Sequence, residues 1–272
     1  MVGSTQRFET FRMLHASGCF VIPNPWDVGS ARLLVGLGFK ALATTSAGSA
    51  WSIGRPDNGV TLEEALAHLR SVAGAVDVPV NADFEGGFAV EPDEVAVNVG
   101  RAVETGVAGL SIEDSSGDPI DPLFAFDLSV ERIRAARRAI DANGGQVLLT
   151  GRSEGFVVGR PDLAETVRRL RAYADAGADC LYAPRIGTPD EIAAVVDAVA
   201  PKPVNVLVGG DFTTVADLAA LGVRRISVGG GLARVAWGAF IEAATEIAEH
   251  GTFGGLGRGI PFDDIDGSFI DD

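Results

Sequence analysis

The chain has 272 residues, of which 47% are hydrophobic, and its formal net charge at neutral pH is −15. This hydrophobic fraction excludes global disorder, and so large an excess of acid argues against nucleic acid or an anionic membrane surface as a partner. Two cysteines are too few for a disulfide scaffold or a four-cysteine zinc site. The sequence has no signal-peptide pattern and no apolar run of about 18 residues, so we expect a cytoplasmic protein.

Short β-type runs alternate with amphipathic helical patterns along the whole chain. Most of the runs are continuously apolar, which is typical of parallel strands covered on both faces. The predicted strands span residues 19–23, 41–45, 79–83, 109–113, 147–151, 180–183, 204–208 and 225–228. The predicted helices span residues 28–35, 62–75, 92–105, 129–142, 162–176, 189–199, 213–221 and 232–250.

Eight strands and eight helices in strict alternation predict a (β/α)8 TIM barrel, a fold that needs about 250 residues as one domain. We therefore expect a single barrel domain over residues 1–250, and a doubly wound open sheet is the alternative. The acidic, glycine-rich segment 251–272 is expected to leave the barrel as a C-terminal extension. Side chains suited to capping helices precede several of the predicted helices. These are Asp27, Thr61, Ser129, Thr188 and Thr213.

Carboxylates follow three neighbouring predicted strands, at the end of the barrel where active sites form. Asp83 and Glu85 end strand three, Glu113 ends strand four, and Arg152 and Glu154 follow strand five. Crowded carboxylates repel one another and favour a shared cation, and oxygen ligands favour Mg²⁺ or Mn²⁺ over zinc. Alternatively, each acid caps the next helix or pairs with an arginine.

Lysine and histidine are scarce, and all five of them are expected to lie away from this site. Lys40 and Lys202 precede strands two and seven, at the opposite end of the barrel. His15 precedes strand one, His68 lies within a helix, and His250 ends the last helix. This placement argues against a Schiff-base aldolase and against a zinc enzyme built on histidines. A hard metal with carboxylates, arginines, amides and hydroxyls suits cleavage next to a 2-oxo acid, because the metal stabilises the resulting enolate.

Two groups of residues could bind the two ends of such a substrate. Arg152 would hold the substrate carboxylate, assisted by Ser46 and the two backbone amides that follow it. A second anion could lie where residues 229–231, all glycine, open the last helix, with Arg234 one turn further on. The glycine run could equally serve tight packing between strand and helix.

Five stretches of the chain resemble the isocitrate lyase/phosphoenolpyruvate mutase superfamily. They are TTSAGSAWSIGRPD (44–57), VNADFEGGF (80–88), GLSIEDSSGD (109–118), LTGRSEGF (149–156) and PVNVL (203–207). They fall in order at predicted strand ends, and the likeness extends from about residue 8 to residue 250. The resemblance implies a Mg²⁺-dependent barrel, with Mn²⁺ as a possible substitute, that acts on small anionic 2-oxo acids. It also implies exchange of the last helix between subunits and a homotetramer built as a dimer of dimers.

The resemblance assigns roles residue by residue. It implies a metal site whose carboxylates bind largely through water, with Glu85 standing where Asp is usual; these carboxylates are Asp83, Glu85 and Glu113. The implied catalytic residues are Asp57, Glu113 and Arg152. The implied substrate-binding residues are Ser46, Ala47, Gly48, Arg152, Asn205 and Arg234.

The chain departs from the family pattern in two places. Lyases of the family carry a Lys-Lys/Arg-Cys-Gly-His/Leu loop after strand four, whose Cys supplies a proton, and mutases carry Lys and Asn there. Residues 115–124 read SSGDPIDPLF and contain none of these, and Pro184 stands at the strand-six position that is Glu in the lyases. Cys180 is a remaining proton-donor candidate, but its place inside a strand favours a core role. Metal-assisted decarboxylation needs less machinery, because CO₂ leaves without being protonated.

The leading prediction is therefore a Mg²⁺-dependent lyase that cleaves a carbon–carbon bond next to a 2-oxo acid, with oxaloacetate-like decarboxylation as the simplest case. One alternative is P–C bond chemistry, as in phosphonopyruvate hydrolase or phosphoenolpyruvate phosphonomutase, with Arg185 or Arg234 meeting the phosphoryl group. Another alternative is a 2-oxo acid binding protein that lost catalysis together with its loop. Whether the loop over residues 115–127 closes on the substrate is open.

Overall fold

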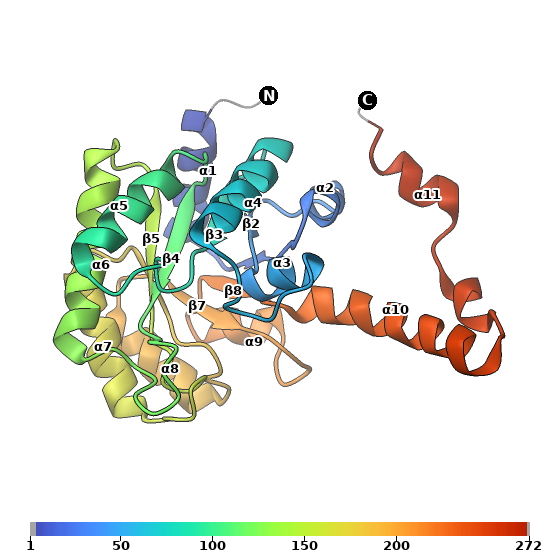
Figure 1. The fold of residues 1–272 in the computed structure, drawn as a ribbon. Helices are drawn as coiled ribbons and strands as arrows, with labels where there is room; N and C mark the ends of the chain where they lie inside the picture. Colours follow the sequence, from blue (N-terminus) through green and yellow to red (C-terminus); the bar gives the residue numbers. More distant parts are fainter. Residues whose placement is uncertain (1–3, 271–272) are drawn as a thin grey trace.

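The computed structural model describes residues 4–270, and its centre is a parallel eight-stranded sheet (Figure 1). The strands are β1 (Phe20–Ile22), β2 (Leu42–Ala43), β3 (Val80–Asp83), β4 (Gly109–Glu113), β5 (Leu148–Arg152), β6 (Cys180–Tyr182), β7 (Val204–Leu207) and β8 (Arg225–Ser227). Each strand from β2 to β8 pairs with the next, and β8 pairs with β1. The amide of Ala43 donates to the carbonyl of Pro23 at 3.0 Å, which links the remaining edges. The predicted (β/α)8 barrel is thus confirmed, and the open doubly wound sheet is excluded.

Helices surround the barrel and connect its strands. They are α1 (Ser4–Ala16), α2 (Val28–Gly36), α3 (Ser46–Ser52), α4 (Leu62–Ala75), α5 (Pro92–Val103), α6 (Phe126–Ala142), α7 (Leu163–Asp175), α8 (Pro189–Val199), α9 (Val215–Ala220), α10 (Gly231–His250), the 3₁₀ helix η1 (Gly254–Arg258) and α11 (Phe262–Gly267). The sequence patterns did not predict α1 or α3. No helix of the described residues is long and apolar enough to cross a membrane.

The predicted helix caps are correct at three positions and wrong at two. Asp27, Thr61 and Thr188 each accept from a backbone amide in the first turn of their helix and form a capping box. Ser129 is not a cap, because α6 begins at Phe126 and the Ser129 hydroxyl donates back to the carbonyls of residues 124 and 125. The cap of α9 is Thr214, one residue after the predicted Thr213.

The barrel interior is apolar at one end and polar at its middle. Phe11 of α1 packs with Ile22 and Leu148 at the end opposite the site. Above them, the guanidinium of Arg225 donates to Asn205 Oδ1 at 2.9 Å and to Thr150 Oγ1 at 3.1 Å. The described residues place no carboxylate within ion-pair distance of Arg225. The floor beneath the site therefore carries a buried cation held by neutral groups.

The C-terminal arm, which we define as α10, η1 and α11, extends outward from the barrel (Figure 1). Within α10 only Ala233 is buried, whereas large apolar side chains along the arm are exposed. These include Val235, Phe240, Ile241, Leu256 and Phe262. Two residues beyond the arm, the carbonyl of Phe269 accepts from Arg32 Nη2 of α2 at 3.3 Å. The described residues leave these apolar side chains of the arm without a covering surface.

Candidate active site

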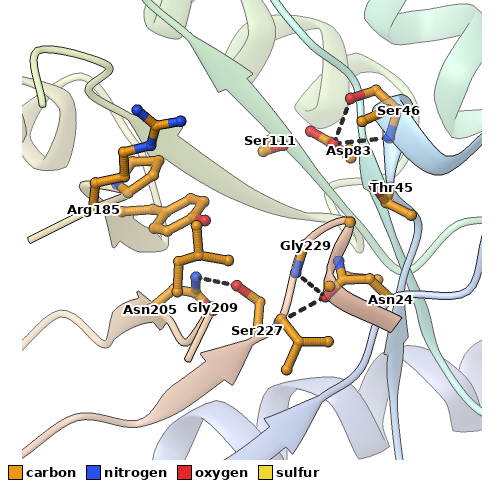
Figure 2. Close-up of a pocket in the computed structure, with 18 of the residues that line it drawn as sticks. Asn24, Thr45, Ser46, Asp83, Ser111, Arg185, Asn205, Gly209, Ser227 and Gly229 are labelled. Carbon is orange, nitrogen blue, oxygen red and sulfur yellow. Dashed lines mark hydrogen bonds between the residues drawn. The ribbon is translucent and has the colours of Figure 1, made fainter. Parts of the chain in front are cut away.

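A cavity of about 710 Å³ opens at the carboxyl ends of the strands, and all eight strands contribute to its lining. Figure 2 shows part of its wall. The predicted site residues in its wall are Ser46, Ala47, Asp57, Asp83, Arg152, Asn205 and Arg234. Three predicted residues, Gly48, Glu85 and Glu113, lie outside the lining. The cavity wall within the described residues contains no lysine, histidine or cysteine.

Arg152 is the centre of the acidic side of the cavity. Its Nη1 donates to Asp83 Oδ1 at 3.1 Å and lies 3.2 Å from Glu113 Oε2, and its Nε and Nη2 bind the carboxylate of Glu154. Three of the five N–H donors of the guanidinium are thus engaged in hydrogen bonds, and Glu113 adds an ion pair. Glu113 lies directly opposite Arg152 in the β4–β5 pairing, so strand register brings the two together. A substrate carboxylate would therefore compete with Asp83, Glu113 and Glu154 for Arg152.

Three carboxylates around one arginine leave this side with surplus negative charge. Burial raises the pKa of Glu113 well above its usual value, and the charges of Glu154 and Asp83 raise it further although Arg152 opposes them. Burial also raises the pKa of Glu154. The pKa of Glu85 rises to about 7, first through burial and then through the charges of Asp83 and Asp57. The carboxyls thus lie near enough to repel, which is the condition that a shared cation would relieve.

The segment predicted to hold a substrate carboxylate is engaged by the protein itself. The amide and the hydroxyl of Ser46 donate to Asp83 Oδ2 at 3.0 and 2.8 Å (Figure 2). The amide of Gly48 donates to Thr45 Oγ1 at 3.3 Å. A Cβ at Gly48 would lie 2.7 Å from Thr45 Cγ2, so this glycine allows close packing. Only Ala47 keeps a backbone amide for which the described residues provide no partner. A substrate carboxylate here would compete with Asp83 for the donors of Ser46.

The glycine run after β8 lines the cavity and also packs closely against neighbouring residues. The amides of Val228 and Gly229 both donate to Asn24 Oδ1 at 2.9 Å (Figure 2). A Cβ at Gly230 would lie 3.2 Å from the ring of Trp51. These contacts favour the packing interpretation of residues 229–231.

Two arginines line the other side of the cavity. Arg185 lies across it from Asp83 and Ser46 (Figure 2). It has a left-handed φ of 69°, and its Nη1 donates only weakly, to the carbonyl of Val157 at 3.5 Å. Arg234 is exposed and lines the same cavity. Within residues 4–270, neither guanidinium has a carboxylate partner, so this side carries uncompensated positive charge.

One inward-facing aromatic residue of the site was missed by sequence reasoning. Tyr182 on β6 lies opposite Arg152 in the strand register, and the Arg152 guanidinium carbon lies 5.3 Å from its ring centroid. Burial raises the pKa of Tyr182 to about 12, so its phenol stays protonated at neutral pH. Its signal was available in the alternation of β6, because Tyr182 lies two residues before Pro184.

Asn205 and Cys180 contribute to the core of the barrel. The amide nitrogen of Asn205 donates to Ser227 Oγ at 2.9 Å, and its oxygen accepts from Arg225, so both ends of the side chain are engaged. Asn205 therefore forms part of the cavity floor. Cys180 is fully buried in β6, as expected for a core residue, and burial raises the pKa of its thiol.

The loop after β4 stands apart from the cavity. Ser115 and Leu123 form an antiparallel bridge, and the amide of Ser116 donates to the carbonyl of Pro122 at 3.0 Å. The Ile120 side chain at its tip is 84% exposed. Residues 115–124 are absent from the lining of the cavity.

The acidic side was tested for its fit to a divalent cation. No three His, Cys, Asp or Glu side chains in the described part of the chain are placed to ligate a metal ion directly. The donors are nevertheless all oxygen atoms, their charges exceed that of Arg152, and the buried Glu85 Oε1 has no hydrogen-bond partner. This set fits a hard cation bound partly through water.

The closed barrel with an acidic site at the carboxyl ends of β3 to β5 defines a class of metabolic (β/α)8 enzymes. Residues 11–248 match the model of the phosphoenolpyruvate phosphomutase family, and the chain belongs to that family. It is thus an enzyme of the isocitrate lyase/phosphoenolpyruvate mutase superfamily, whose members cleave carbon–carbon bonds or act as mutases.

Three similar proteins illustrate the range of the family. A provisionally assigned lyase/mutase from Burkholderia cenocepacia J2315 is 50% identical, with a TM-score of 0.95 over 98% of this chain and 97% of that chain. The uncharacterized protein Rv1998c of Mycobacterium tuberculosis is 34% identical over 96% of each chain. An oxaloacetate decarboxylase of Paraburkholderia xenovorans is 31% identical, covering 82% of this chain and 75% of the relative.

Proposed function

We propose that the protein is a Mg²⁺-dependent lyase that cleaves a carbon–carbon bond next to a small 2-oxo acid, with decarboxylation of an oxaloacetate-like substrate as the simplest case. The observation that carries the proposal is the crowding of Asp83, Glu113 and Glu154 around a single Arg152 at the cavity. The likeness to an oxaloacetate decarboxylase supports the reaction class.

Asp83, Glu85 and Glu113 would hold the cation, and Mn²⁺ would substitute for Mg²⁺ because both are hard ions with oxygen ligands. When bound, the ion would supply Lewis-acid stabilisation of the charge that develops on the 2-oxo group as the bond breaks. Each of the three acids lies near another carboxylate and is therefore a better cation ligand than an isolated, fully hydrated one.

The remaining residues would bind the substrate and transfer protons. Ser46 and Ala47 would orient the carboxylate next to the 2-oxo group, together with the N–H groups of Arg152 that are not used in its hydrogen bonds to Asp83 and Glu154. Asp57 lies at the cavity wall, where partial burial and then the charge of Asp83 raise its pKa. A carboxyl with a raised pKa suits proton transfer. Tyr182 keeps its proton at neutral pH and is a second donor in reach of the cavity.

The composition of the cavity favours decarboxylation over cleavage that needs a protonated leaving group. The cavity wall holds no lysine, histidine or cysteine in the described chain, and the loop after β4 lies outside it. Loss of CO₂ places no proton on the departing fragment, so it does not require the acid that this loop supplies in the lyases.

P–C bond chemistry on phosphonopyruvate is a second candidate. The observation that favours it is the pair of arginines, Arg185 and Arg234, whose charges no carboxylate of residues 4–270 neutralises. A phosphonate carries charge that two guanidinium groups bind well. The distal carboxylate of a dicarboxylic 2-oxo acid would use the same arginines, so a product assay must distinguish the two.

We also propose that α10 is exchanged between two subunits and that the assembly is a dimer of dimers. The exposure of Val235, Phe240 and Ile241 on a helix with one buried residue supports this arrangement. Light scattering of the full chain tests it, with a tetramer expected and a monomer contradicting it.

The test of the activity is an assay of oxaloacetate and phosphonopyruvate, with Mg²⁺ and after metal removal by EDTA. Because Mg²⁺ alone decarboxylates oxaloacetate slowly, each rate is compared with an enzyme-free blank and with the Asp83→Asn variant. Pyruvate formed from oxaloacetate only with metal supports the lead proposal. Phosphate or a phosphonate product supports P–C chemistry. Turnover that survives complete metal removal overturns the metal-dependent mechanism, and ligand-induced thermal stabilisation without turnover identifies a binding protein.

A further inference from the structure

The turn that carries Glu85 has an unusual backbone conformation. Glu85 has a φ of 47° and Phe88 a φ of 56°, and both lie in the left-handed region that non-glycine residues rarely adopt. Gly87 between them has a φ of 75°. Such a conformation persists only where the surrounding structure imposes it.

Six consecutive carbonyls of this turn accept hydrogen bonds from outside it. The carbonyl of Glu85 accepts from the amide of Glu113 at 3.1 Å. Asn98 Nδ2 donates to the carbonyls of residues 87 and 88 at 2.9 and 3.4 Å. Arg132 binds the other three, donating through Nη1 to residues 89 and 90 at 2.5 and 2.6 Å and through Nη2 to Gly86. Half of the turn's carbonyls therefore depend on one side chain of α6.

Arg132 is a buried cation whose guanidinium serves this turn. The residue is 1% exposed, and no carboxylate of the described residues forms an ion pair with it. The ring of Phe124, which belongs to the loop after β4, lies 4.1 Å from the guanidinium carbon. Burying a cation without a carboxylate partner costs free energy. The three carbonyls and the aromatic ring stabilise the buried guanidinium of Arg132. Arg132 does not line the cavity.

We infer that Arg132 is a positioning residue for the proposed metal site: it fastens the turn over residues 85–90 and so holds the Glu85 carboxyl beside Asp83 and Glu113. This inference rests on the proposed metal-dependent function. In proteins generally, residues that orient metal ligands without touching the metal affect affinity by about 10- to 100-fold. Arg132 would act on Glu85 in this way through the backbone.

The test compares wild type with Arg132→Met, which keeps an unbranched apolar side chain without donors, and with Arg132→Lys, which keeps the charge with a different donor geometry. Amide hydrogen exchange of peptides over residues 84–91 is measured without metal, and Mn²⁺ affinity is measured by titration. We expect Arg132→Met to accelerate exchange in these peptides and to weaken Mn²⁺ binding by about tenfold, and Arg132→Lys to restore part of both.

Val195→Ala is the matched control, because it removes buried volume from α8 and lowers stability by an ordinary core effect. If Arg132→Met destabilises the fold as this control does, with exchange at residues 84–91 and Mn²⁺ affinity unchanged, the positioning role is overturned. If wild type binds no Mn²⁺, the proposed metal site fails, and the exchange result alone then decides whether Arg132 fastens the turn.

Discussion

The two sides of the cavity carry opposite surpluses of charge. On the side of β3 to β5, Asp83, Glu113 and Glu154 share the single cation of Arg152. On the side of β6 to α10, Arg185 and Arg234 have no carboxylate partner within the described residues. The first side is suited to a divalent cation and the second to an anionic group, so a bound 2-oxo dianion would have one defined orientation.

The largest expected effect is on the acidic side. Asp83→Asn keeps the size and the hydrogen-bonding shape of the side chain but removes a charge that the cation needs. We expect kcat/KM with Mg²⁺ to fall by about 100- to 1000-fold, measured beside a thermal melt that shows the variant folded. Unchanged Mg²⁺-dependent kinetics would mean that this side does not bind the metal.

Arg152→Met tests whether the arginine balances the carboxylates. Removing one partner of a buried ion pair leaves uncompensated charge, so we expect the free energy of unfolding at neutral pH to fall by about 3 kcal/mol, measured by urea denaturation. Arg134→Met is the control, because its ion pair with Glu131 is about half exposed. That variant should lose less than about 1 kcal/mol. Equal losses in the two variants would refute the balancing role.

Arg185→Ala and Arg234→Ala test the cationic side. We expect each to raise KM for a dianionic 2-oxo acid by about tenfold, or about 1.4 kcal/mol, with kcat nearly unchanged. Inhibition by pyruvate, which has one carboxylate, is the control and should change much less. If the two substitutions weaken pyruvate inhibition as much as they raise KM for the dianion, the arginines do not bind a second anionic group.

The smallest expected effect concerns Glu85 and pH. Its folded-state pKa of about 7 is raised above the ordinary value of 4.5, so the folded protein binds this proton more tightly than the unfolded chain. This carboxyl therefore costs stability above pH 7, and the cost disappears as pH falls from 7 toward 4.5. Without metal, Glu85→Gln should remove about 1 kcal/mol of the pH dependence of the unfolding free energy. Identical pH profiles for variant and wild type would contradict the raised pKa.

The barrel could be predicted because its strands are continuously apolar and alternate with amphipathic helices. The α3 helix was missed because Ser46–Ser52 lies in what the pattern shows as a loop. The start of α6 was misplaced because Ser129 has a capping side chain but bonds backward to residues 124 and 125. Propensity identifies a residue suited to a cap, whereas tertiary context decides whether it is one.

Much of the acidic side could also be predicted, since Asp83, Glu113 and Arg152 all end their strands. Their mutual pairing could not, because it depends on the register of β4 against β5. The amide of Gly229, the first residue of the glycine run, donates to Asn24, which lies 205 residues earlier in the chain. Contacts between such distant residues leave no local pattern in the sequence. The place of Tyr182 beside Arg152 is not evident from the sequence, because it depends on the register of β5 against β6.

The most direct test of the central claim is Mn²⁺ binding, followed by electron paramagnetic resonance, in wild type and Asp83→Asn. The account predicts that each wild-type chain binds a Mn²⁺ ion that Mg²⁺ displaces, and that Asp83→Asn loses this binding while remaining folded. Wild-type protein that binds no Mn²⁺, or a variant that binds it as tightly, would contradict the account.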